Sequence, residues 1–317
     1  MKAKSRARYI IASLALAVLI MALVCLFVGA SRMSFSDGVA ALFGKGSAAN
    51  VRILRSIRVP RVLAALIAGA ALSVSGLVMQ TTLSNAMASP STMGVSNAAV
   101  FGANLSIIVF AGGFLSTGNN LASYTAGVNP FAASVTAFLF SALSILLILA
   151  LCRVKAFSPN VVVLAGIAVG AIWTAATTLL QFYATDVGLS AAVVWNFGDL
   201  GRATYKTDLL MLCAAAPELA VFSALAWRYN ALLSGDAAAG SMGVTAAGVS
   251  SLGIIGFVGV ICPHVAKRLL GQDHRVSIPA SALLGSLLLL CADALSRSLG
   301  SGSALPVGAI TALLVEA

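Results

Sequence analysis

The chain has 317 residues, of which 60% are hydrophobic and only 9% are charged, with a formal net charge of +10. Soluble domains carry about 25% charged residues, so this composition excludes an ordinary water-soluble globule. The apolar residues form blocks near the roughly 20 residues that a helix needs to cross a bilayer. They lack the period-2 alternation of a membrane barrel. The sequence therefore predicts an all-α polytopic membrane protein, with residues 1–317 forming one transmembrane domain.

The first apolar segment covers about residues 9–30 and follows four basic residues, Lys2, Lys4, Arg6 and Arg8. It is about 22 residues long, whereas the apolar region of a cleaved signal peptide has about 7–15. We therefore expect a retained first helix. Basic residues favour the cytoplasmic side, so the N-terminus is predicted to lie in the cytoplasm.

Further membrane-spanning helices are expected wherever polar or glycine-rich stretches separate long apolar runs. These runs cover about 62–82, 94–115, 131–152, 160–183, 207–227 and 277–296. Between them, 31–60 is predicted as a polar external stretch and 189–197 as a short interfacial helix. The longest predicted cytoplasmic loop is 228–243.

Residues that could carry chemistry are sparse. The only histidines are His264 and His274, and the five cysteines form no CxxC pair, so neither a metal nor another cofactor is predicted. The basic residues lie at the ends of apolar segments and are not interleaved with aromatic residues, which argues against nucleic-acid binding. Glu218 falls within an apolar segment, where a carboxylate is a candidate functional residue. A structural role, protonated or facing the bundle interior, is the favoured interpretation.

Four arginines, Arg52, Arg55, Arg58 and Arg61, lie in the stretch predicted to be external. This placement conflicts with the preference of basic residues for the cytoplasmic side. A basic external patch could dock an acidic partner protein. Alternatively, the side chains could reach lipid phosphates at the interface. The charge pattern leaves both explanations open.

Two groups of motifs point to one family. The first contains Arg58-Val-Pro-Arg61, Ser75-Gly76, Gln80, Asn85 and Met93-Gly94-Val95-Ser96. The second contains Gly256-Phe-Val-Gly259, Pro263-His264, Asp273-His274-Arg275, Ala292-Asp293 and Leu305-Pro306-Val-Gly308. In this order, and over nearly the whole chain, they resemble the FecCD/BtuC-like permeases of ABC importers for iron–siderophores, haem or vitamin B12.

The resemblance implies a ten-helix permease bundle that forms a homodimer in the bacterial inner membrane. It also implies two ATPase subunits at the cytoplasmic face and an external substrate-binding protein. The chain has no GxxxxGK[ST] phosphate loop, so ATP hydrolysis is expected on the partner and this subunit is not expected to be an enzyme. An iron–siderophore chelate is the expected substrate, with cobalamin and haem as alternatives.

The resemblance also assigns roles to particular residues. It implies that Arg58, Arg61 and Arg297 pair with acidic residues of the binding protein, and the i,i+4 spacing suggests that Asp293 holds Arg297. It implies that 228–243 is a coupling loop of two short helices against the ATPase, with the matching residues Leu232, Gly235, Asp236, Ala238, Met242 and Gly243. A cytoplasmic gate is expected near Ser158, Pro159 and Asn160.

Two departures from the family pattern affect the expected function. Only residues 244–255 separate Gly243 from Gly256, about one membrane crossing fewer than the family pattern, so helix seven is expected to be shortened. The stretch from Val307 to Ala317 is too short to cross a hydrocarbon core of about 30 Å. Two alternatives stay open. The shortened segments suggest an inactive membrane scaffold subunit, and the carboxylate of Glu218 suggests an ion-coupled secondary transporter.

Overall fold

The computed structural model describes residues 2–27, 34–85, 88, 93–114, 130–154, 159–198, 200–244, 261–299, 307–308 and 310–311. Every regular element in these ranges is a helix, and an isolated antiparallel bridge joins Phe114 to Ala184. The all-α prediction is confirmed. Most of the predicted helix seven and of the last apolar stretch falls outside the described residues.

The chain divides into two compact units, which are described one at a time. Unit 1 comprises Met1–Val78, Gly198–Val244 and Gly259–Ala317, and unit 2 comprises Met79–Phe197 and Thr245–Val258. Whether 1–317 acts as a single domain stays a prediction.

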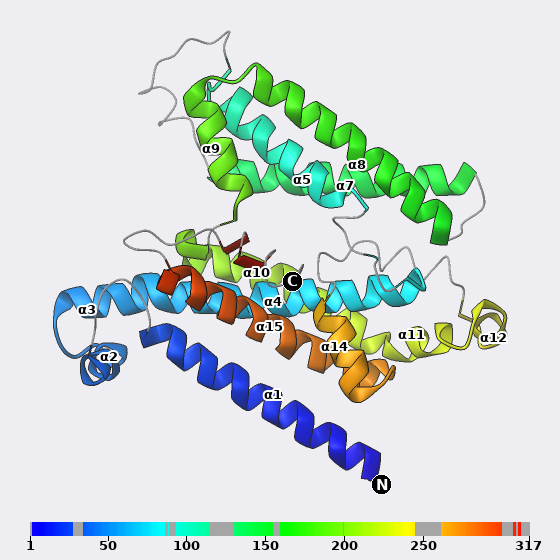
Figure 1. Ribbon diagram of the computed structural model, residues 1–317, viewed down its shortest axis with the longest axis horizontal. Coiled ribbons are helices and arrows are strands. Elements are labelled where there is room, and N and C mark those ends of the chain that lie inside the picture. Colours follow the sequence, from blue (N-terminus) through cyan, green and yellow to red (C-terminus); the bar gives the residue numbers. More distant parts are fainter. Residues whose placement is uncertain are drawn as a thin grey trace. The chain divides into compact units, whose positions relative to one another are not determined.

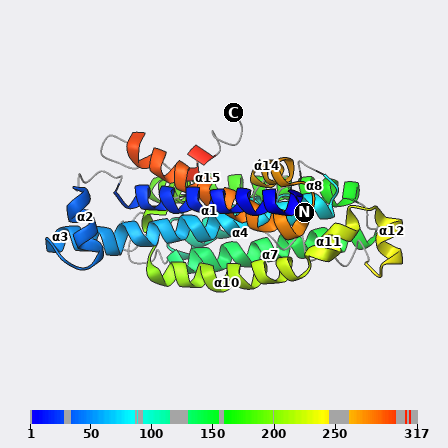
Figure 2. The same ribbon diagram turned by 90° about the horizontal axis from the view of Figure 1, so that it is seen from below.

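Unit 1 contains the elements to which the resemblance assigns the docking and coupling roles. Its first part holds α1 (Lys2–Phe27), α2 (Phe35–Leu42), α3 (Ala48–Ile53), the π-helix η1 (Leu54–Arg58) and most of α4 (Val59–Thr82). Its second part holds η4 (Leu200–Arg202), α10 (Tyr205–Ala224), α11 (Ala226–Leu232), α12 (Asp236–Ser241), α14 (Ile261–Leu270) and α15 (His274–Leu299). Figures 1 and 2 show α2 and α3 at one end of this unit and α11 and α12 at the other.

The core of unit 1 lies where α1, α4 and α15 meet. Cys25 of α1, Val62 and Ala65 of α4, and Leu290 of α15 are buried against one another. Gly69 of α4 and Gly285 of α15 bring the two backbones into direct contact, since a Cβ built on Gly69 would lie 2.6 Å from the Gly285 carbonyl carbon. Small residues are what allow helices to approach this closely in lipid.

The described part of the predicted external polar stretch, residues 34–60, is largely helical, whereas the sequence predicted no membrane helix between about residues 30 and 62. Ser47 caps α3 through a 3.3 Å hydrogen bond from the Asn50 N–H to its Oγ. From there α3, η1 and α4 run without a break over Ala48–Thr82, a 35-residue apolar span. Arginine is a good helix former, and its long side chain can reach polar partners from a helix. The four arginines that were predicted to lie in a polar stretch between helices therefore lie on a continuous helix.

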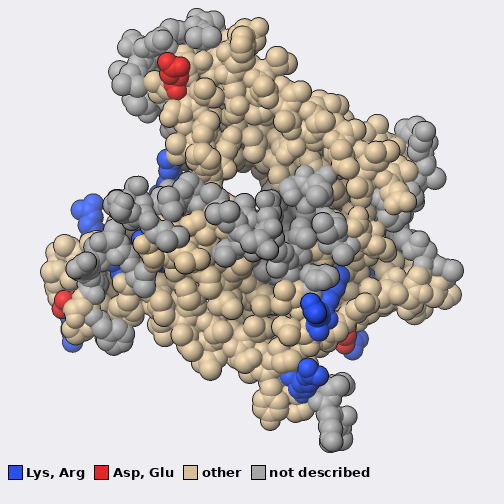
Figure 3. Space-filling view, viewed as in Figure 1, with Lys and Arg blue, Asp and Glu red and all other residues tan. Residues whose placement is uncertain are grey.

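The predicted membrane crossings are otherwise well matched. Six described helices are long and apolar enough to cross a membrane: Ser5–Phe27, Ala48–Thr82, Phe131–Cys152, Asn160–Phe182, Tyr205–Ala224 and His274–Ser298. The run predicted at 94–115 forms a shorter apolar helix, Val95–Phe110. Most of the described surface drawn in Figure 3 is uncharged. Large apolar side chains such as Phe138 and Leu164 are about 70% exposed, as lipid-facing residues are.

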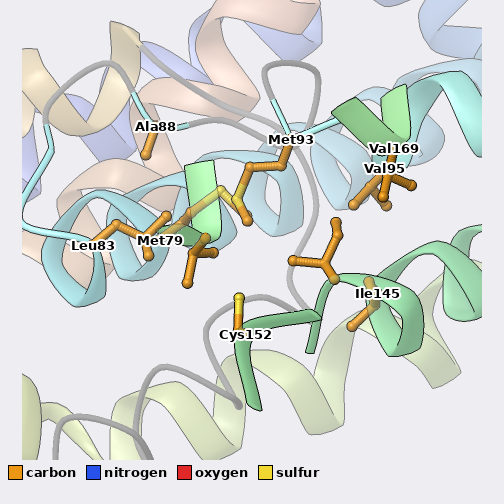
Figure 4. Packing of buried hydrophobic residues seen from close by; sticks show 10 residues of the cluster. Met79, Leu83, Ala88, Met93, Val95, Ile145, Cys152 and Val169 are labelled. Atoms are coloured by element: carbon orange, nitrogen blue, oxygen red, sulfur yellow. The ribbon is translucent and has the colours of Figure 1, made fainter. Parts of the chain in front are cut away.

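Unit 2 contains α5 (Val95–Asn104), the π-helix η2 (Leu105–Phe110), α7 (Pro130–Val154), α8 (Pro159–Phe182) and α9 (Asp186–Asn196). Its main core includes Met79, Met93, Ile145 and Val169, which are drawn in Figure 4. Gly94 precedes α5 with a φ of +71°, where a Cβ would lie 2.6 Å from the Gly170 nitrogen, so only glycine fits there. The predicted short helix at 189–197 is confirmed as α9, which Thr185 caps by accepting a hydrogen bond from the Gly188 N–H.

Candidate functional site

The three arginines assigned to docking gather in one cluster of unit 1. Arg61 at the start of α4 and Arg297 near the end of α15 both pair with Asp293, with Arg61 Nε 2.5 Å from Oδ1 and Arg297 Nη2 2.7 Å from Oδ2. The Asp293 side chain is completely buried, and both arginine side chains are 8% exposed. One carboxylate therefore holds two guanidinium groups from different helices. We refer to Arg58, Arg61, Asp293 and Arg297 as the arginine cluster.

The end of α1 supplies the remaining acceptors. Arg58 Nη1 donates to the carbonyl oxygens of Leu26 and Phe27, at 2.7 and 2.9 Å, and Arg297 Nη1 donates to that of Cys25 at 2.9 Å. The last carbonyls of a helix have no partner within the helix and carry its negative dipole end. Cationic side chains are therefore stabilised at this position. The expected i,i+4 contact between Asp293 and Arg297 is confirmed, whereas the role of the arginines in docking stays a prediction.

At the opposite end of unit 1, residues 228–243 form the two short helices α11 and α12, as the resemblance implied (Figures 1 and 2). We refer to this stretch as the coupling segment. Leu233 and Met242 are 42% and 50% exposed, although both are large apolar residues. The two side chains flank α12 on either side.

Glycines shape the coupling segment. Gly235 and Gly243 flank α12 with φ values of +93° and +74°, which L side chains rarely adopt. Leu232 is buried, Ala238 is half-buried, and Asp236 begins α12. All six predicted coupling residues therefore lie in or beside α11 and α12.

An unforeseen polar bridge joins the coupling segment to α15. Asn230 of α11 donates from Nδ2 to Asp273 Oδ1 at 2.7 Å, and its Oδ1 accepts from the His274 backbone N–H at 2.8 Å. The ring Nδ1 of His274 also lies 2.8 Å from Asn230 Oδ1. We refer to Asn230, Asp273 and His274 as the Asn230 bridge. The motif Asp273-His274-Arg275 was recognised in the sequence, but nothing in the pattern pointed to Asn230.

We expect Asp273 to give the protein a measurable acid sensitivity. Burial alone would raise its pKa, but hydrogen bonds from the Asn230 side chain and the Arg275 N–H, together with the charge of Arg275, lower it overall. A carboxyl with a lowered pKa stabilises the fold above its unfolded pKa of about 4 and loses this contribution as the pH falls through the folded pKa. The melting temperature of the wild type should thus exceed that of Asp273→Asn at neutral pH, and the two should converge below about pH 4. A difference that stays constant with pH would contradict this assignment.

The other candidate residues are less informative. Ser158 lies outside the described residues, Pro159 begins α8 and Asn160 is exposed, so the gate stays a prediction.

Glu218 of α10 accepts a hydrogen bond from Ser75 Oγ of α4. This interhelical bond supports the structural interpretation of Glu218. Within the described part of the chain, no group of three or more His, Cys, Asp or Glu residues could hold a metal ion.

Comparison with known proteins decides the family. The model of the FecCD transport family matches residues 16–316 of the chain. The chain belongs to the FecCD transport family. A Methanocaldococcus jannaschii protein whose name describes an ABC transporter permease is 40% identical over 306 residues, covering 91% of this chain and 86% of that protein.

Relatives within the FecCD transport family carry names with several substrates. The hemin transport system permease protein HmuU of Yersinia pestis is 34% identical over 82% of this chain and 79% of its own length. The iron(3+)-hydroxamate import system permease protein FhuG of Bacillus subtilis is 30% identical, with 86% and 83% covered. A solved inward-facing structure of a metal-chelate type ABC transporter has a TM-score of 0.78 at 24% identity, over 97% of this chain and 96% of that one. This FecCD chain is therefore a multi-pass membrane permease with the fold of an ABC transporter permease.

Proposed function

We propose that this chain is the permease subunit of a bacterial ABC importer for an iron–siderophore chelate. In this proposal two copies form the translocation path in the inner membrane, two ATPase subunits bind the coupling segment, and a substrate-binding protein docks outside. Family membership is the observation that carries this proposal. The coupling segment at one end of unit 1 and the arginine cluster at the other end agree with it. The relative named for iron(3+)-hydroxamate import supports the choice of substrate.

The orientation follows from the same arrangement. The four basic residues before the first apolar segment favour a cytoplasmic N-terminus. A single crossing by α1 then puts its C-terminal end, which contacts Arg58 and Arg297, on the outside. The coupling segment at the opposite end of unit 1 faces the cytoplasm, where the ATPase would bind.

The arginine cluster suits an acidic partner. It contains three guanidinium groups and one carboxylate, so two positive charges remain for the α1 carbonyls and for an incoming anion. Acidic residues of a binding protein would complement this charge and orient the encounter. Arg61 is only 7% exposed. In docking, the positive charge of the cluster would therefore act from just beneath the surface.

The proposed function is tested by transport in reconstituted vesicles. The permease is combined with its ATPase and binding protein and supplied in parallel with a radiolabelled iron(III)–hydroxamate chelate, hemin or vitamin B12. ATP-dependent accumulation of the iron chelate is expected. Accumulation of hemin or B12 instead would overturn the proposed substrate. Co-purification of the ATPase without uptake of any of the three would indicate an inactive scaffold.

Charge introduced on the coupling segment should prevent ATPase binding without unfolding the permease. Leu233→Asp and Met242→Asp place a carboxylate on exposed apolar side chains, so the melting temperature should change little. In a buried contact the same carboxylate would be desolvated without a partner, and binding should weaken at least about tenfold. Co-purification of the ATPase with the detergent-solubilised permease measures this. Ser234→Asp, on an exposed polar residue of the same segment, is the control, and equal binding by all three variants would refute the assignment.

A further inference from the structure

The Asn230 bridge fixes the coupling segment to the first turn of α15. Asp273 precedes α15, and its Oδ1 accepts the Arg275 N–H at 3.0 Å, as an N-cap residue does. Asn230 Oδ1 in α11 accepts the hydrogen bond of the His274 N–H from outside the helix. Two oxygens therefore accept the first N–H groups of α15. One is Oδ1 of Asn230 itself, and the other is Oδ1 of Asp273, which is hydrogen-bonded to Asn230.

The chemistry of the bridge fixes its orientation. A carboxylate can only accept, so the Asn230 amide must turn its Nδ2 to Asp273 and its Oδ1 to His274. An amide oxygen can also only accept, so His274 Nδ1 carries the hydrogen in this contact. The donors and acceptors of the bridge match in one arrangement only. A substitution of Asn230 that breaks this match can be compensated by a complementary substitution of Asp273.

Packing reinforces the bridge. Tyr229, next to Asn230, is completely buried, with its ring centroid 5.7 Å from that of His274 and 6.2 Å from that of Phe222 in α10. Burial raises the pKa of Tyr229 to about 12, against a smaller opposing effect of Arg228, so the ring stays neutral at physiological pH. The last turn of α11 is thus held to α10 and α15 by both polar and aromatic contacts.

The other end of α15 carries Asp293 and Arg297 of the arginine cluster. The helix is continuous over 26 residues, about 39 Å at 1.5 Å per residue. Along its length it contacts α4 through Gly285, and Ser286 Oγ donates to the Leu66 carbonyl at 2.8 Å. One helix therefore connects the coupling segment with the arginine cluster, and both belong to the same unit.

We propose that α15 transmits the docking signal between the arginine cluster and the coupling segment, and that Asn230 is the positioning residue that connects the segment to this helix. The proposal rests on the proposed function and adds to it how the two partner sites communicate. A displacement of α15 caused by a docked binding protein would move the α11 end through the Asn230 bridge. Without the bridge, the coupling segment would still bind the ATPase but would no longer follow α15.

The test measures ATP hydrolysis by the reconstituted permease–ATPase complex with and without the binding protein. Stimulation is the ratio of the hydrolysis rates with and without the binding protein, which cancels any change in basal hydrolysis. Asn230→Ala should lower this ratio by about tenfold, as expected for the loss of a charge-assisted hydrogen bond and its neighbour. Ser234→Ala, on the same segment, should keep the full stimulation.

An exchange of the two side chains distinguishes transmission from mere folding. In the double variant Asn230→Asp with Asp273→Asn, the new carboxylate can accept from His274 and from the new amide, whose oxygen can accept the Arg275 N–H. Stimulation should recover in this variant and stay lost in each single one. Normal stimulation in Asn230→Ala, or no recovery in the double variant, would overturn the proposal. If even the wild type shows neither stimulation nor uptake, the proposed function itself is wrong.

Discussion

Replacing Asp293 by asparagine is expected to lower the free energy of unfolding by about 3–5 kcal/mol, the usual cost of removing one partner from a buried ion pair. Asp293 is completely buried and is the carboxylate that pairs with both Arg61 and Arg297. An amide of the same shape keeps the packing but leaves two guanidinium groups without a counter-charge. Thermal and denaturant unfolding of the detergent-solubilised permease would measure the loss.

The matched control is Asp37→Asn, the same substitution at an exposed residue in the first turn of α2. It should cost no more than about 0.5 kcal/mol, because only a weak interaction with the helix dipole is lost. If Asp293→Asn destabilises the protein no more than Asp37→Asn, the arginine cluster does not depend on its carboxylate.

Replacing the three ion-paired residues of the arginine cluster together separates stability from docking. When a buried ion pair or triad is replaced by apolar side chains of similar size, stability is often kept or increased. The triple variant Arg61→Met, Asp293→Leu and Arg297→Met should therefore recover most of the stability lost in Asp293→Asn. It should still fail to bind the substrate-binding protein if Arg61 and Arg297 dock it, whereas normal binding would assign these two arginines a purely structural role.

The second large effect is expected at the crossing of α4 and α15. Gly285→Ala places a Cβ 2.5 Å from the Cβ of Ser73 and also against the Gly69 backbone, where no flexible side chain can move away. Overpacking of this kind costs about 1–3 kcal/mol, or more where backbone must shift. We expect a clear loss of melting temperature and of folded yield in the membrane.

Gly240→Ala is the matched control for this crossing. Gly240 lies in α12 with open space where a Cβ would be, so alanine should be neutral or slightly stabilising in the helix. Equal melting temperatures for Gly285→Ala and Gly240→Ala would show that the two helices can separate at no cost. That outcome would also remove the rigid contact through which α15 is proposed to act.

The sequence by itself determined most of the membrane-crossing helices of this protein. The expected crossings at 131–152 and 160–183 agree with Phe131–Cys152 and Asn160–Phe182 almost to the residue. The reason is local: in lipid each backbone polar group must be paired within its own segment, so apolar length alone specifies a helix. The motifs likewise indicated the family, and the resemblance implied the two short helices of the coupling segment.

What the sequence could not provide is which side chains meet across the fold. Charge in 31–60 suggested a loop, although Arg58 and Arg61 lie on a continuous helix and find their partners in α1 and α15. Arg61 and Asp293 are 232 positions apart, and Asn230 and His274 are 44 apart. No local periodicity encodes such pairs, because helices in lipid are brought together by close packing and polar contacts and not by a hydrophobic pattern. Only the tertiary structure therefore showed that the arginines form one cluster and that α15 connects this cluster with the coupling segment.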